Sequence, residues 1–246
     1  MKIVVAAMVR NEEGRFLRSA LSAWKQFADE VLILDDHSED ESVAIAEAAG
    51  ATIVSSAMTE AAWGAETPLR AQLWNEACAR TENGDIIFIL DADMVPARNP
   101  REFFEAVPNA EGFAFPLYDL WAEYSDKMLM YRSDKFWQGH NNPRVWAVRR
   151  QDAPPEGWQW GERGIHCGHL PLNFRVKRLA TVPKEYALLH YAYVDEKRRQ
   201  EKYKQYKDVR PQLSAFEWAH AQSILDPTPF LKTLPFKNEF HLKCGS

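Results

Sequence analysis

The sequence KIVVAAMVRNE, which spans residues 2–12, decides the fold class. Its apolar part, residues 3–9, is unbroken, and this pattern is typical of a strand that is covered on both faces. The polar residues Arg10, Asn11 and Glu12 follow at once. The run is short for the apolar region of a signal peptide, and no small-residue cleavage site follows it. We therefore expect it to be the first strand of a buried sheet.

The chain beyond this strand alternates between strand and helix patterns up to about residue 100. The predicted strands are 30–34, 52–55 and 86–90, and the predicted helices are 12–27, 38–50, 67–80 and a short one after residue 100. Asn11 is a suitable N-cap for the first helix, and Ser38 with Glu41 makes a capping box for the second. Alternation with short links predicts an α/β fold with a mostly parallel central sheet and helices on both faces.

The bulk composition indicates one globular domain and excludes several classes of protein. The chain has 246 residues, of which 46% are hydrophobic and 26% are charged. Its net charge of −5 argues against broad nucleic-acid binding, which needs a basic face. Cys78, Cys167 and Cys244 are too few and too widely spaced for a disulfide framework, so we expect a reducing cytoplasmic location. No stretch approaches the ~18–20 apolar residues of a membrane span.

The second half of the chain has a different pattern. Residues 112–160 are dense in aromatic side chains and hold five of the nine tryptophans. Short strands are predicted at 112–117, 145–148, 174–179 and 187–190, and a charged helix is predicted at 195–207. Prolines after residue 226 indicate an irregular tail.

Polar residues follow three of the predicted strands of the first half at the point where each strand ends. They are Arg10, Asn11 and Glu12 after the first strand, Asp35 and Asp36 after the second, and Asp91 and Asp93 after the fourth. The carboxyl ends of parallel strands share one edge of a sheet, and ligands of such sheets bind there. These side chains are therefore expected to converge on one binding site.

Asp91 and Asp93 are separated only by Ala92 and come directly after a buried strand. Two carboxylates placed so closely repel each other unless a cation lies between them. Mn²⁺ or Mg²⁺ is the expected partner, because such ions take carboxylate ligands and keep coordination positions for phosphate oxygens. The alternative is a solvated strand end with a turn before Pro96.

Asp35 and Asp36 can accept hydrogen bonds from a nucleobase N–H or a ribose hydroxyl. The alternative, which is compatible with the first, is a negative charge that complements the dipole of the following helix. The chain has neither the G-x-G-x-x-G pattern of dinucleotide-binding domains nor the G-x-x-x-x-G-K-[ST] pattern of P-loop proteins. A nucleotide would therefore be held by carboxylates, a metal ion and loop backbone.

Four segments together resemble the successive motifs of family 2 glycosyltransferases, in that family's order and near its spacing. They are residues 8–13, 34–40, 69–77 and 84–93. The resemblance covers roughly residues 2–100 and is weaker beyond. It implies a GT-A fold and a transferase that moves a sugar from a nucleoside-diphosphate sugar to an acceptor hydroxyl, with inversion at the anomeric carbon. It also divides the chain into a nucleotide-sugar-binding half (1–100), an acceptor-side half (101–210) and an irregular tail (211–246).

The resemblance assigns roles to individual residues of the donor site. It places Asp36 and Asp35 near the base and ribose, Asp91, Ala92 and Asp93 in the metal and diphosphate motif, and Arg10, Asn11 and Glu12 beside the nucleotide sugar. It implies that Arg70 faces the diphosphate, for which the alternative is a surface arginine. It implies that His190 lies near the metal, for which the alternative is a buried structural histidine.

The general base is the least determined part of the prediction. The resemblance implies an acidic residue after the middle of the chain, but Cys167 stands where a carboxylate is expected. Glu162 is the first candidate for the base, followed by His166 and Asp119. Zinc binding by His166, Cys167 and His169 is disfavoured because the segment has no second pair of ligands at finger spacing.

The acceptor is not specified by any motif; a glycan, a lipid-linked sugar and a polymer are all compatible with the sequence, and nucleic acid is not favoured. Trp121 or Trp137 is expected to line the acceptor cleft and stack on a sugar ring, with the other tryptophans in the core. The basic residues of 195–207 are interpreted as a solvated helix face. Two alternatives stay open: a degenerate GT-A module that binds nucleotide or glycan without turnover, and a transferase that acts on modified nucleic acid or protein.

Overall fold

Strand β1 (Ile3–Val9) lies inside the main sheet of the computed structural model, between β2 and β4. The structure describes residues 1–61, 65–123, 128–161 and 168–244. Within these ranges the main sheet has seven strands in the order β10-β6-β9-β4-β1-β2-β3. Their bounds are β2 (Glu30–Asp35), β3 (Thr52–Ser55), β4 (Ile86–Ile89), β6 (Gly112–Phe115), β9 (Arg144–Arg149) and β10 (Leu179–Thr181). Only β9 runs antiparallel to its neighbours in this described sheet, so the prediction of a mostly parallel sheet is confirmed.

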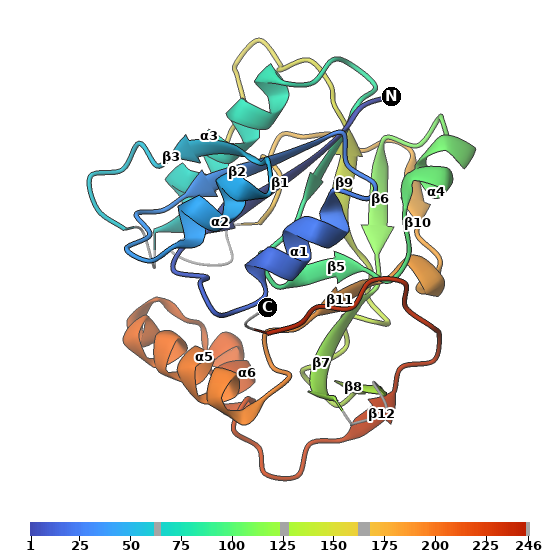
Figure 1. The fold of residues 1–246 in the computed structure, drawn as a ribbon. Helices are drawn as coiled ribbons and strands as arrows, with labels where there is room; N and C mark the ends of the chain where they lie inside the picture. The colour runs from blue at the N-terminus through green and yellow to red at the C-terminus, as the bar shows by residue number, and fades with distance from the viewer. Residues whose placement is uncertain (62–64, 124–127, 162–167, 245–246) are drawn as a thin grey trace.

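Helices cover both faces of the main sheet, as Figure 1 shows. Helices α1 (Leu17–Trp24), α2 (Ser42–Ala48) and α4 (Arg101–Ala106) share one apolar cluster with alternate residues of β1, β2 and β4. Helix α3 (Glu66–Ala79) packs on the intervening residues of the same strands, on the opposite face. Because side chains alternate across a strand, the unbroken apolar runs supply both clusters, which confirms the predicted α/β class.

A second, smaller sheet carries the strands that complete the site. In the described residues its order is β12-β8-β7-β11-β5. The bounds are β5 (Met94–Pro96), β7 (Leu117–Glu123), β8 (Leu129–Arg132), β11 (Leu188–His190) and β12 (Leu231–Thr233). Strand β11 pairs antiparallel with β5 and parallel with β7, which joins segments that are about a hundred residues apart in the chain.

Two helices lie between β11 and β12 in the chain and pack on each other at one end of the molecule (Figure 1). They are α5 (Glu196–Asp208) and α6 (Ala215–Ser223), and the short 3₁₀ turns are η1 (Lys184–Tyr186) and η2 (Arg210–Gln212). A third apolar cluster lies beneath them and contains Trp121, Trp137, Tyr193 and Tyr206. The chain end then returns to α1, where Ser19 Oγ donates to the Lys243 carbonyl at 3.1 Å.

Two predicted helix caps are wrong. Helix α1 begins at Leu17 and not after Asn11, and helix α2 begins at Ser42 without a side-chain cap from Ser38. The polar side chains at these positions join the two loops instead. Ser38 Oγ accepts the Asn11 backbone N–H at 3.0 Å, and Asn11 Oδ1 accepts the Glu39 N–H at 2.9 Å. Local sequence indicates only that such side chains bind backbone, and the loop that they bind is decided by the sheet.

The C-terminal region also differs from its prediction. Residues 211–246, expected to be irregular, contain α6 and β12, and α6 begins with a capping box between Ser214 and Glu217. The strand predicted at 174–179 is irregular except at Leu179, where β10 begins. Among the described residues, no helix is both long and apolar enough to cross a membrane.

Candidate functional site

The loops after β1 and β2 form one rigid edge of the site. Val9 is paired with Asp35, so the residues that follow both strands begin side by side. Asn11 and His37 adopt left-handed backbone conformations, with φ of 51° and 58°. Such conformations are uncommon outside glycine and occur here in residue types that tolerate them. The bonds from Asn11 to the second loop therefore fix the direction in which this edge faces.

Asp35 and Asp36 are both buried at this edge. Asp35 Oδ2 accepts the Ser38 N–H at 3.2 Å, whereas its Oδ1 is buried without a hydrogen-bond partner among the described residues. A buried polar atom without a partner is costly, and a bound ligand is one way to satisfy it. A donor N–H or O–H of a nucleoside would supply that hydrogen bond.

Arg70 and Asp91 form the centre of the site. Arg70 on α3 is 7% exposed, and its Nη2 lies 3.3 Å from Asp91 Oδ1. Its Nε and Nη1 are buried without partners among the described residues. Burial would raise the pKa of Asp91, but the Arg70 guanidinium, followed by His169, His190 and Lys202, lowers it to about 2. The alternative of a surface arginine is wrong, because Arg70 is buried beside the carboxylate.

His190 lies between two carboxylates. Pairing of β11 with β5 and β7 sets His190 opposite Met94 on one side and opposite Asp119 on the other. Its Nδ1 is 2.7 Å from Asp119 Oδ1, and its Nε2 is 3.5 Å from Asp93 Oδ1. Burial would lower the pKa of His190, but Asp93 and Asp119 together raise it. The geometry is that of a histidine oriented through Nδ1–H by a carboxylate.

A large cavity opens over these residues. Its volume is about 1000 Å³. At one end its lining carries charged groups, including Glu66, Arg70, Asp91, Asp119, His190 and Lys202. Aromatic residues of the second half also line it, including Phe136, Trp137, Trp146, Tyr193 and Phe216. The cavity therefore combines a charged region at the carboxyl ends of the strands with an aromatic region, and it is large enough for a small-molecule ligand.

Lys202 is a site residue that the sequence prediction missed. It lies on the charged helix that was interpreted as a solvated face, but it is half-buried and lines the cavity. Burial would lower its pKa, and Tyr206, Asp93 and Asp91 raise it. Spacing offers one signal, because Lys202 and Tyr206 are four residues apart and share a helix face. The sequence does not show which way that face points, because the packing of α5 on the rest of the chain decides it.

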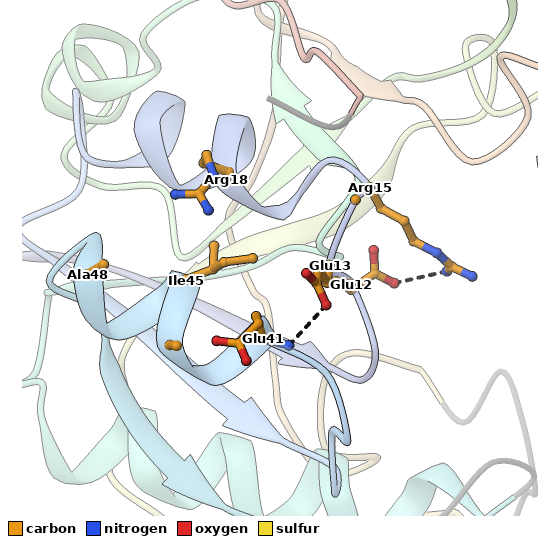
Figure 2. Close-up of a pocket in the computed structure, with 9 residues that line it drawn as sticks. Glu12, Glu13, Arg15, Arg18, Glu41, Ile45 and Ala48 are labelled. Carbon is orange, nitrogen blue, oxygen red and sulfur yellow. Dashed lines mark hydrogen bonds and ion pairs between the residues drawn. The ribbon is translucent and has the colours of Figure 1, made fainter.

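Glu12 lines a second pocket of about 410 Å³ between α1 and α2 (Figure 2). Burial is the main reason that the pKa of Glu12 is raised to about 7, and the charge of Asp93 adds to the effect. Its Oε1 is 3.2 Å from Arg15 Nη1, while the neighbouring Glu13 accepts the Glu41 N–H at 3.3 Å. Glu12 is thus electrostatically linked to Asp93 and is not among the residues that line the large cavity.

The remaining predicted site residues lie in different surroundings. Glu162 and His166, the first two candidates for the general base, lie outside the described residues. Asp119, the third, is engaged by His190. Arg10 is exposed, and Ala92 is buried in the core beneath the metal motif. Their roles, like those of the other site residues, stay predictions.

The two tryptophans that were expected at the cleft differ in placement. Trp137 lines the cavity, and Trp121 packs behind it with ring centroids 4.8 Å apart. Trp121 also stacks on Tyr193 at 5.5 Å. Both rings are nearly buried, at 1% exposure for Trp137 and 3% for Trp121, so Trp137 forms part of the cavity floor and Trp121 supports it.

The donor set at the charged end is chemically suited to a divalent cation. No group of three or more histidine, cysteine, aspartate or glutamate side chains in the described ranges is arranged as a metal site. Mg²⁺-type ions need few protein ligands, since one or two carboxylates plus substrate phosphates suffice. Asp119 holds His190 with Nε2 directed toward Asp93, which is the arrangement of a metal-ligating histidine with an outer carboxylate. The residues present therefore fit such an ion.

Comparison with known proteins adds partial structural similarity. No protein-family model matches the chain, and no curated protein does. Glucosyl-3-phosphoglycerate synthase from Mycobacterium tuberculosis, solved with Mn²⁺, UDP and glucosyl-3-phosphoglycerate, is 25% identical with a TM-score of 0.32, over 48% of this chain and 44% of that one. The same enzyme with UDP is 25% identical with a TM-score of 0.32, over 50% and 45%. A further mycobacterial protein is 18% identical with a TM-score of 0.36, over 48% and 41%.

The chain thus matches less than half of the length of each of these structures. The metal and nucleotide belong to those proteins. The architecture of the described residues is a mixed α/β fold with a central, mostly parallel sheet.

Proposed function

We propose that this protein is a metal-dependent glycosyltransferase of the family 2 type, which moves a sugar from a nucleoside-diphosphate sugar to an acceptor hydroxyl. The observation that carries the proposal is Arg70, whose guanidinium is buried at the cavity with two nitrogens unpartnered among the described residues. A guanidinium in such a place suits an anion, because its planar fork matches phosphate oxygens and its burial strengthens the interaction.

The donor would lie along the edge formed by the strand ends. Asp35, with its unpartnered Oδ1, is suited to a ribose or base donor, and Asp36 is buried beside it. Arg70 would bind the diphosphate from α3, and Lys202 would add positive charge from α5. These two cations come from opposite parts of the chain, so the diphosphate would be bound between them.

Asp93 and His190, with Asp91 beside them, would hold the Mn²⁺ or Mg²⁺ ion. When bound there, the ion would neutralise negative charge that develops on the leaving diphosphate. Asp119 would keep the Nδ1 proton of His190 and so fix the direction of Nε2.

The reaction would be a single displacement. The acceptor oxygen forms a bond to the anomeric carbon while the bond from that carbon to the β-phosphate oxygen breaks, and the nucleoside diphosphate leaves. The hydroxyl proton passes to a general base, for which Glu162 and then His166 are our candidates, because Asp119 is occupied by His190. One displacement of this kind inverts the anomeric carbon.

Thermal unfolding tests the donor site directly. UDP, GDP, CMP and dTDP would each be added with and without Mn²⁺, since a ligand that binds the native state raises Tm. We expect one nucleoside diphosphate to raise Tm only when Mn²⁺ is present, and Arg70→Met to abolish the shift. No shift with any nucleotide, in protein that unfolds cooperatively, would contradict the proposal. Nucleotide binding without transfer or donor hydrolysis would favour the degenerate module.

A further inference from the structure

The aromatic wall of the large cavity is built by two segments that the donor site does not use. Phe136 and Trp137 follow β8, and Phe216 and His220 lie on α6. The rings of Phe136 and Phe216 are 5.5 Å apart with planes inclined by 62°. The His220 ring lies 4.5 Å from Trp137. Four rings from separate parts of the chain therefore meet at one side of the cavity.

Helix α6 divides its side chains between the protein core and the cavity. Ala221 and Ile224 pack in the third apolar cluster, whereas Phe216 and His220, four residues apart, share the face that lines the cavity. Phe216 is 67% exposed, although a phenylalanine usually lies in the core. An exposed aromatic side chain at the mouth of a cavity indicates a ligand contact more than a contribution to the core.

The floor of this region is rigid. Trp137 is 1% exposed, and its indole Nε1 donates to Ser223 Oγ on α6 at 3.0 Å. Trp121 and Tyr193 pack against it at 4.8 Å each. Rigid aromatic rings give apolar contact area with little loss of side-chain entropy when a ligand binds.

Polar groups lie next to the rings. From Gln212 to His220 the cavity-lining residues are Gln212, Ser214, Phe216, Glu217 and His220. On the other side, the Lys135 ammonium lies over the Phe136 ring, 5.2 Å from its centroid. Hydroxyl groups of a ligand can bind the amide, hydroxyl and carboxylate oxygens of such side chains.

We propose that this region, which we name the aromatic subsite (Phe136, Trp137, Phe216 and His220), binds the acceptor and takes a sugar ring. The inference rests on the proposed function where it calls the bound sugar an acceptor, whereas the binding of the sugar does not depend on that function. The apolar face of the sugar lies on the rings of Phe136 and Phe216, and its hydroxyl groups face Gln212 and Glu217. The same cavity leads to the charged end, so a hydroxyl of the bound sugar can reach the donor.

Saturation-transfer NMR on the full chain tests the subsite without requiring turnover. The probes are the methyl glycosides of glucose, galactose, mannose and N-acetylglucosamine. We expect transfer from the aromatic protons of the protein to at least one of these neutral glycosides. Transfer to none of them would overturn the inference.

Two phenylalanines make a matched pair of variants. Phe216→Ala removes a ring of the subsite, whereas Phe230→Ala removes one that is 57% exposed and does not line the cavity. We expect Phe216→Ala to weaken glycoside binding at least ~10-fold and Phe230→Ala to leave it unchanged. Phe216→Trp should keep binding, because it keeps an aromatic face. Equal effects of Phe216→Ala and Phe230→Ala would contradict the assignment.

The nucleotide experiment separates the two proposals. If Mn²⁺ and a nucleoside diphosphate raise Tm while no neutral glycoside binds, the donor site stands and the aromatic subsite is wrong. If a neutral glycoside binds in a Phe216-dependent way while no nucleotide binds, the subsite stands and the transferase reaction is wrong. Phe216→Ala should leave unchanged any shift in Tm that a nucleotide causes.

Discussion

The first hundred residues and the rest of the chain supply the site in different ways. In the first part, Asp35, Asp36 and Asp91 lie at the edge because Asp35 ends β2, Asp36 follows it, and Asp91 comes soon after β4 in the same sheet. In the second part, Asp119 and His190 meet because β7 and β11 pair, although 71 residues separate them. Strand direction therefore brings together the residues of the first part, whereas pairing of distant strands brings together those of the second.

The two parts also differ in what fills their cores. The strands β1, β2 and β4 bury mainly isoleucine, valine and leucine. Beneath α5 and α6 the cluster is aromatic, and it encloses Arg132, which is 2% exposed on its side chain. Arg132 pairs with Asp134 and Asp226 and lies over Trp121 at 4.6 Å from the ring centroid. A buried ion network gives a more specific but more vulnerable core than aliphatic packing does.

The largest expected effect is that of Arg132→Met, which removes the centre of the ion network. Arg132→Met leaves Asp134 and Asp226 with uncompensated charge and should lower the free energy of unfolding by about 3–5 kcal/mol. Urea unfolding followed by tryptophan fluorescence measures it. Leu32→Ala, in the aliphatic part, should cost about 2–5 kcal/mol without leaving a charge. A loss below ~1 kcal/mol for Arg132→Met would contradict the role of the network.

Asp93→Asn tests whether the metal motif is the functional part of the first half. It removes a charged ligand candidate from the charged end and should reduce transfer, or donor hydrolysis in its absence, about 10²–10³-fold. Nucleotide-dependent Mn²⁺ binding, followed by electron paramagnetic resonance, should weaken in parallel. The exposed Asp208→Asn on α5 is the matched control and should behave as the unmodified protein does. Equal activity of the two variants would show that Asp93 is not part of the site.

Arg70→Met and Arg70→Lys distinguish charge from geometry on α3. We expect Arg70→Met to weaken nucleoside-diphosphate binding about 10–100-fold, measured by calorimetry, because the buried guanidinium fork is lost. Arg70→Lys keeps the charge but not the planar fork, so its affinity for the nucleoside diphosphate should lie between those of the unmodified protein and of Arg70→Met. The loss of Arg70 also removes the main cause of the low pKa of Asp91, so that pKa should rise. Identical nucleoside-diphosphate affinities of Arg70→Met and Arg70→Lys would show that the loss of binding comes from altered packing and not from the lost charge.

Asp119→Asn tests how the second half of the chain contributes to the site. The contact with His190 Nδ1 orients the imidazole, and loss of such an outer carboxylate typically weakens metal binding about 10-fold or more. Mn²⁺ titration measures the affinity, and nitrogen NMR of the His190 ring reports whether the Nδ1-protonated tautomer is lost. A change in affinity with an unchanged tautomer would contradict the positioning role. Asp134→Asn, away from His190, should leave both readouts unchanged.

Glu12→Gln should have an effect only at high pH. The folded-state pKa of Glu12 is raised from 4.5 to about 7, so ionised Glu12 destabilises the fold. This destabilisation is absent below pH 4.5, grows as pH rises, and is complete above 7, at about 3 kcal/mol at most. Thermal unfolding in EDTA should therefore show a higher Tm for Glu12→Gln at pH 8 and no difference at pH 4.5. A gain in Tm at both pH values would contradict the titration.

Much of the fold follows from local pattern, and the site follows from it only in part. The apolar runs predict β1, β2 and β4 nearly to the residue, because a strand buried on both faces has no polar positions between its ends. The missed elements, α6 and β12, lie between prolines and have no long apolar run. Lys202 was missed for a related reason, because the mean polarity of α5 does not tell which of its faces meets the cavity.

The sequence by itself determined that the chain is an α/β protein and that Asp35, Asp36, Asp91 and Asp93 follow strands of one sheet. It could do so because strand direction and side-chain alternation are local properties. Only the tertiary structure decided that His190 lies between Asp93 and Asp119, that Arg70 is buried with open donors, and that Phe136 meets Phe216. These contacts depend on pairing and packing between distant segments, whose register and facing are chosen by the free energy of the whole fold.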